Sequence, residues 1–191
     1  MLNALSVQTG NYMIQGMFVQ EGRTMMLSAE NNLSSGLLIQ VDRMNLPNKE
    51  TWKLRLRNHT ESVMIGRLLF TIRKRQANGP QTAYVSPCDR LVWHYSGSSV
   101  GISGCSLEQI GRVRMSVSVD RPGLEEEWLE DRLPYSPLAS GDVCTLISCE
   151  VQIGPLQTSE GDVWLLEEEA ESLLAASRLS AKNGLAFQKE R

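Results

Sequence analysis

Histidine and cysteine, together with paired acidic residues, most often carry catalysis or bind metal, and this 191-residue chain has only two histidines, His59 and His94. A Ser-His-Asp device would have to use one of them, and no Gly-x-Ser-x-Gly nucleophile turn is present. His94 stands in Trp93-His-Tyr95, an aromatic sequence typical of a strand. No Gly-x-Gly-x-x-Gly or Walker motif occurs. We therefore expect no catalysis and no cofactor.

The cysteines also argue against a metal centre. Cys88, Cys105, Cys144 and Cys149 lack the short paired spacings of zinc sites. In a strand, Cys144 and Cys149 would point to opposite faces, so small buried hydrophobic residues are the better interpretation. The N-terminal sequence has no secretion signal, which predicts free thiols, a reducing compartment and a protein that is not secreted.

Positive charge is concentrated between positions 53 and 75, where Glu61 is the only acidic residue. Lys53, Arg55 and Arg57 alternate with leucines, so in a strand they share one face. Such a surface could hold RNA phosphates or anionic lipid head groups, and the alternative is an ordinary solvated face. The candidate nucleic-acid or lipid-binding residues are Lys53, Arg55, Arg57, Arg67, Arg73, Lys74 and Arg75.

Acidic residues form an opposite pole at 125–131 and 167–171. Complementary charges on one molecule could support head-to-tail self-association, and unconnected surface charge is the alternative. Leu133-Pro-Tyr-Ser-Pro-Leu138 contains two prolines, which predict an extended segment for a partner to capture or a plain connector. The candidate self-association or partner residues are Glu125, Glu126, Glu127, Tyr135 and Leu138.

Composition predicts one soluble folded domain. The chain has 41% hydrophobic residues and a net charge of -3, from 19 basic and 22 acidic residues, so it has no strong overall attraction for nucleic acid or anionic lipid. No apolar run approaches the roughly 18 residues that a membrane-spanning helix needs.

The elements that must position these residues are mainly strands. Turn-forming residues divide the first eighty positions into short segments, and 12–19, 37–41 and 90–95 have strand composition. The segment 63–72 could be a strand or a short helix, and its β-branched content favours a strand. Alternation at 113–119 and 143–153 predicts two strands, each with one face in the core and one in solvent.

Two segments differ from this pattern. Four glycines in Gly97–Gly104 predict a flexible loop. Apolar residues at helical spacing from Trp164, after a possible N-cap at Asp162, predict a C-terminal amphipathic helix that ends near Asn183-Gly184. The expected fold is α+β: a β-rich, sandwich-like core domain of short, mostly antiparallel strands at 1–160, with a C-terminal helix and frayed tail at 161–191 packed on it.

The order of several short segments resembles the rhabdovirus matrix proteins. These segments are Tyr12-Met-Ile-Gln-Gly16, Val63-Met-Ile-Gly66, the sequence from Asp89 to Ser99, and Gly161-Asp-Val-Trp164. The resemblance implies a non-enzymatic viral structural protein of the host cytoplasm, peripheral membrane or virion. Such a protein forms homo-oligomers and bridges nucleocapsid protein or RNA to an anionic membrane surface through its basic patch. A basic N-terminal arm and a Pro-Pro-x-Tyr motif are absent.

A second resemblance is to the plant-virus 30K-type movement proteins. Leu38-Ile-Gln-Val-Asp42-Arg-Met44 is similar to the Leu-Val-Asp-x-Arg strand of that family, and Asp89-Arg-Leu-Val-Trp93 is similar to its second Asp segment. That family implies a jelly-roll-like core that binds single-stranded nucleic acid. A cellular β-sandwich interaction module, which would stay monomeric, is the third alternative.

Overall fold

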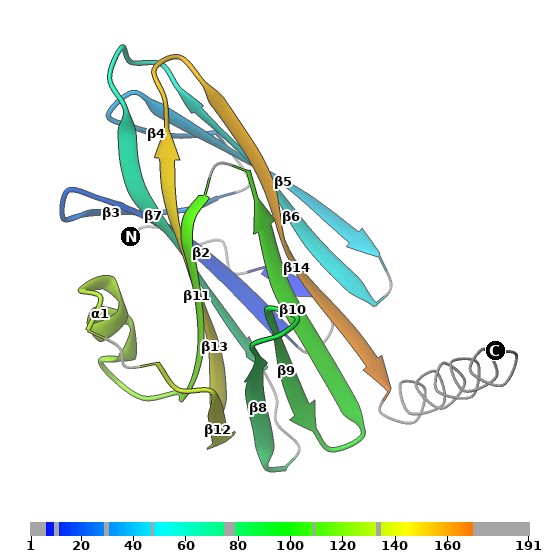
Figure 1. Ribbon diagram of the computed structural model, residues 1–191. Helices are drawn as coiled ribbons and strands as arrows, with labels where there is room; N and C mark the ends of the chain where they lie inside the picture. The colour runs from blue at the N-terminus through cyan, green and yellow to red at the C-terminus, as the bar shows by residue number, and fades with distance from the viewer. Residues whose placement is uncertain are drawn as a thin grey trace, which may run out of the picture.

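Two antiparallel β-sheets packed face to face form the structure (Figure 1). The computed structural model describes residues 7–9, 12–28, 31–46, 48–74, 79–108, 110–132 and 135–169. The six-stranded sheet has the order β1 (Val7–Thr9), β2 (Tyr12–Gln20), β7 (Met64–Lys74), β13 (Val143–Ile153) and β11 (Ile110–Val119), with β3 (Arg23–Met26) also beside β2. The eight-stranded sheet has the order β12 (Leu138–Gly141), β8 (Gln81–Ser86), β9 (Leu91–Ser96), β10 (Ser99–Leu107), β14 (Thr158–Glu169), β6 (Lys49–Asn58), β5 (Leu37–Leu46) and β4 (Asn32–Ser34).

The hydrophobic core lies between the two sheets and follows from the alternation of each strand. Every second residue of β13 from Val143 to Ile153 points inward and is buried. Across from it, the Trp52 indole of β6 meets the Phe70 ring of β7 edge to face, with centroids 6.4 Å apart. The predicted sandwich of mostly antiparallel strands is therefore confirmed, and 63–72 is resolved in favour of a strand, β7.

A short helix, α1 (Leu124–Leu129), covers part of the outer face of the six-stranded sheet (Figure 1). Leu124 and Trp128 are buried there against Cys144 and Leu146 of β13. This second, smaller core explains why β13 is apolar on both of its faces. No helix among the described residues is long and apolar enough to cross a bilayer.

The prediction of a flexible loop at Gly97–Gly104 is wrong, because Ser99–Leu107 forms strand β10. Its glycines are required by close packing. A Cβ on Gly101 would lie 2.6 Å from the Tyr12 hydroxyl oxygen, and one on Gly104 would lie 2.8 Å from the Trp164 ring. The loss of backbone freedom is offset by pairing on both sides, along the whole of β10 to β14 and over Ser99–Ser103 to β9.

The predicted C-terminal helix is also wrong over its first turns. Residues 161–169 belong to β14, which pairs with both β6 and β10, so they lie within the eight-stranded sheet. Val163 and Leu165 face the core, while Trp164 and Leu166 are apolar residues of the opposite face. A strand that is apolar on both faces produces the same i, i+4 spacing as an amphipathic helix. The remainder of the predicted helix, 170–191, lies outside the described residues.

Candidate binding face on the eight-stranded sheet

The structure does not bring the predicted basic residues to one surface. Lys53, Arg55 and Arg57 share the exposed outer face of β6 in the eight-stranded sheet, as their alternation predicts. Arg67, Arg73 and Lys74 lie on β7 in the six-stranded sheet. Each of these three contacts groups of its own molecule. Arg67 donates to the Leu129 carbonyl oxygen and pairs with Asp131. Arg73 pairs with Asp120 and Glu125, and Lys74 donates to the Ser99 hydroxyl. Arg75 lies outside the described residues.

The predicted acidic pole is partly engaged within the molecule. Glu125 of α1 accepts a 2.9 Å hydrogen bond from Arg73, and Glu127 pairs with Arg121 just before the helix. Glu126 is exposed, as are Tyr135 and Leu138, whose exposed fractions are 63% and 60%. Charges that we expected to meet between molecules therefore meet in part within one molecule.

Carboxylates flank the basic residues of β6. Lys53 stands in register between Asp42 of β5 and Asp162 of β14. The Arg55 Nε lies 2.7 Å from a carboxylate oxygen of Glu160, also on β14. These carboxylates offset the positive charges of Lys53 and Arg55, so a polyanion gains little from this face.

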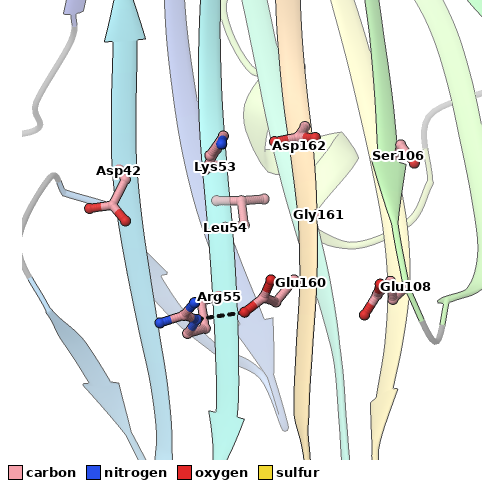
Figure 2. A pocket seen from close by; sticks show the side chains of 9 residues that line it. All are labelled: Asp42, Lys53, Leu54, Arg55, Ser106, Glu108, Glu160, Gly161 and Asp162. Carbon is pink, nitrogen blue, oxygen red and sulfur yellow. Dashed lines mark hydrogen bonds and ion pairs between the residues drawn. The ribbon is translucent and has the colours of Figure 1, made fainter.

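The same residues line a shallow polar groove of about 510 Å³ (Figure 2). The groove is lined by four carboxylates and two cations. Figure 2 shows them spread over neighbouring strands, with Ser106 of β10 at one side. The groove-lining residues are Asp42, Lys53, Leu54, Arg55, Ser106, Glu108, Glu160, Gly161 and Asp162. A Cβ on Gly161 would lie 2.4 Å from the Ser106 carbonyl oxygen, so only glycine lets β14 approach β10 this closely.

A row of aromatic side chains lies on the outer face of the same sheet. Tyr84 of β8 has its ring nearly parallel to those of Trp93 and Tyr95 of β9, at interplanar angles of 3° and 11° and centroid distances of 6.3 and 6.0 Å. All three rings are partly exposed, and Tyr95 is 40% exposed. Partial desolvation raises the pKa of Tyr84 to about 12, and a hydrogen bond with Tyr95 makes the second largest contribution. Its hydroxyl is thus neutral and available for hydrogen bonds at ordinary pH.

Trp164 joins the aromatic row to the polar groove. It lies two residues from Asp162 on β14, so both side chains are on the outer face. Its indole rests against Gly104 on β10, and Lys49 Nζ lies 6.0 Å from the ring centroid. Because β9 and β14 are two strands apart, Trp164 stands about 10 Å from the row of Trp93. We call Tyr84, Trp93, Tyr95, Trp164 and the polar groove together the binding face.

Sequence reasoning missed the four aromatic residues of the binding face. Trp93 and Tyr95 alternate within a predicted strand, and this alternation places both on the same face. Tyr84 reaches them only through the β8–β9 pairing, which the sequence does not specify. The predicted helix gives Trp164 different neighbouring side chains from those that it has in β14.

The histidines and cysteines form no comparable site. His94 is buried between the sheets, where its Nε2 shares a hydrogen bond with the Thr145 hydroxyl. Burial, and secondarily the positive charge of Lys74, lowers the pKa of His94 to about 4, so the ring is neutral. Among the described residues, no cluster of three His, Cys, Asp or Glu side chains could hold a metal ion.

Comparisons with known proteins leave the family of this chain open. No family model matches the sequence, and no curated protein matches it. Among solved structures, the chain is similar to a bacterial glucoamylase complexed with acarbose, with 9% sequence identity and a TM-score of 0.47. That match covers 88% of this chain and 28% of the other chain, so this chain spans little more than a quarter of the enzyme's length. A likeness this low carries no argument about function.

Proposed function

We propose that this chain is a binding module that holds a neutral, hydroxyl-rich carbohydrate chain across the outer face of its eight-stranded sheet. The observation that carries the proposal is the continuity of partly exposed aromatic rings with a groove of closely spaced opposite charges on that face. The two features call for a ligand with both apolar and hydrogen-bonding surfaces.

Aromatic rings suit the flat C–H faces of sugar rings. A pyranose presents axial C–H groups that can lie against an aromatic face while its hydroxyls stay in water or bind polar groups. Trp93 and Tyr95 on one side and Trp164 about 10 Å away would contact an extended chain at separate points. Specific sites generally combine aromatic contact area with a few well-placed polar groups.

The polar groove supplies the complementary hydrogen bonds. Carboxylates accept hydrogen bonds from hydroxyls, while Lys53 and Arg55 donate, so vicinal hydroxyls can bridge neighbouring groups of opposite type. Four carboxylates against two cations give the groove a net negative charge. A phosphate backbone would be repelled there, which favours a neutral ligand over single-stranded nucleic acid.

The test is native gel electrophoresis of the full chain through gels containing a soluble β-glucan, xylan, starch or galactomannan. We expect at least one polysaccharide to retard the wild type, and Trp164→Ala or Trp93→Ala to abolish that retardation. Tyr135→Ala is the matched control, because Tyr135 is exposed but is not part of the binding face. If no polysaccharide retards the protein while single-stranded oligonucleotide or phosphatidylserine vesicles bind it, the proposal fails.

A matrix-like assembly function is the second candidate. One observation favours it: Lys53, Arg55 and Arg57 share an exposed face, on which Arg57 lies opposite Leu38 and Thr158 and not beside an acid. Light scattering over 50 to 500 mM salt, with and without anionic liposomes, tests it. A particle size that increases in a salt-dependent way in the wild type, but not in Arg57→Glu, would support assembly. A protein that stays monomeric at every salt concentration and does not bind the liposomes would contradict it.

A further inference from the structure

Two cysteines from opposite sheets lie in direct contact. Cys105 is on β10 of the eight-stranded sheet, and Cys149 is on β13 of the six-stranded sheet. Their sulfur atoms are 3.6 Å apart across the core. Cys149 is buried and Cys105 is only partly buried, so one member of the pair remains within reach of a small reagent.

We infer that Cys105 and Cys149 form a redox-responsive pair whose oxidation makes a disulfide between the two sheets. A disulfide has an S–S length of about 2.05 Å, so the two sulfurs must approach by about 1.5 Å. The other two cysteines have no such neighbour. Cys144 points to the outer face of β13 under α1, and Cys88 is exposed in the β8–β9 turn.

The geometry also indicates the order of the chemical steps. The two sulfurs share a hydrogen bond in which either can be the donor, and this contact lowers the pKa of Cys105. That same hydrogen bond, together with burial, raises the pKa of Cys149. Because Cys105 is only partly buried whereas Cys149 is buried, Cys105 is the thiol that attacks first and Cys149 the one that resolves.

With oxidised glutathione as the oxidant, the exchange balances in two steps. The Cys105 thiolate attacks one glutathione sulfur, forms a mixed disulfide and releases one glutathione thiolate. Cys149 then gives its proton to solvent and attacks the Cys105 sulfur, and the second glutathione thiolate leaves. Two protein thiols are oxidised, and one glutathione disulfide is reduced to two thiols.

The link would fix the strand beneath the binding face. Cys105 lies between Gly104, on which Trp164 rests, and Ser106, which lines the polar groove. The bond would close a loop between residues 44 apart in sequence, which restricts the unfolded chain and stabilises the folded one. The inference rests on the two sulfurs alone and stands whether or not the face binds carbohydrate.

The test is to equilibrate the reduced full chain with oxidised glutathione and measure intact mass, thiol count and disulfide-linked peptides. We expect a loss of two hydrogen masses, a fall from four reactive thiols to two in denaturant, and a Cys105–Cys149 linked peptide. The oxidised protein should melt roughly 8 to 16 °C higher than the reduced protein.

Variants separate the steps. Cys88→Ser should still form the Cys105–Cys149 linked peptide and lose two hydrogen masses, with its thiol count falling from three to one. Cys149→Ser should stop at glutathione attached to Cys105. Cys149→Ser places a hydroxyl in the core and can destabilise the fold. The identification of the disulfide-linked peptide in the wild-type protein is therefore a sufficient test without this variant. A wild-type protein that keeps four thiols, links Cys88 or Cys144, or stays glutathionylated would overturn the inference.

Discussion

Lowering the pH should destabilise the fold through His94, and the size of the effect follows from its surroundings. His94 is 1% exposed, meets the Tyr12 ring edge to face at 5.8 Å, and is subject to the positive charge of Lys74. Its pKa falls from 6.5 to about 4 on folding. Between these two pH values His94 is protonated in the unfolded chain but neutral in the folded chain. The free energy of unfolding therefore decreases as the pH falls.

The magnitude follows from linkage at about 1.36 kcal/mol per pKa unit. Lowering the pH from 7.5 to 4.5 should reduce the free energy of unfolding by roughly 2 to 3 kcal/mol through His94 alone. Carboxylates also titrate near the acidic end of this range, so the comparison needs a variant without the imidazole. In His94→Gln, an amide can retain a hydrogen bond to Thr145 without titrating.

Urea unfolding of both proteins at half-unit pH intervals measures the effect. The wild type should lose roughly 2 to 3 kcal/mol more than His94→Gln between pH 7.5 and 4.5, with the difference arising below pH 6.5. His59→Gln, which alters an exposed histidine, should follow the wild type. Parallel pH profiles for the wild type and His94→Gln would refute the reasoning.

Three further substitutions test the packing around the proposed sites by urea unfolding. Trp128→Ala should cost about 3 to 5 kcal/mol, because this residue anchors α1 to the six-stranded sheet; a loss under 1 kcal/mol would contradict that role. Glu50→Ala should cost about 3 kcal/mol, because it removes a buried acceptor 3.1 Å from Arg43, and Glu50→Gln should recover part of the loss. Gly161→Ala should cost about 1 to 3 kcal/mol, because its Cβ would meet the Ser106 carbonyl oxygen, whereas the same change at Gly111, where a Cβ has no contact closer than 3.4 Å, should cost less.

Strict alternation made the strands readable from sequence. At 113–119 and 143–153 it identified both strands and, except for the exposed Val119, the residues that face inward, because a strand with a buried face needs period two. The expected solvent face of 143–153 is wrong at its start, because Cys144 and Leu146 are buried under α1. The same signal fails where both faces are covered. Trp164 and Leu166 are apolar on the face opposite Val163 and Leu165, and a continuous apolar run does not distinguish a strand from a helix.

The wrong prediction of a loop at Gly97–Gly104 has a different cause. Composition alone predicts flexibility at Gly97–Gly104, but Gly101 and Gly104 make room for Tyr12 and Trp164, which come from distant parts of the chain. A contact of that kind cannot be inferred from local sequence. The prediction of one basic surface is wrong for a similar reason. Arg57 and Arg67 are close in sequence, but they belong to strands of different sheets.

The most direct test of the binding face is a proton–nitrogen NMR titration of the indole N–H groups. The chain has four tryptophans, of which Trp93 and Trp164 belong to the binding face, whereas Trp52 and Trp128 are 1% and 4% exposed. The titrant is the polysaccharide that most retards the protein, supplied as a short oligosaccharide. We predict that the Trp93 and Trp164 signals shift while those of Trp52 and Trp128 stay in place. Unchanged signals for Trp93 and Trp164 at saturating oligosaccharide would contradict the account.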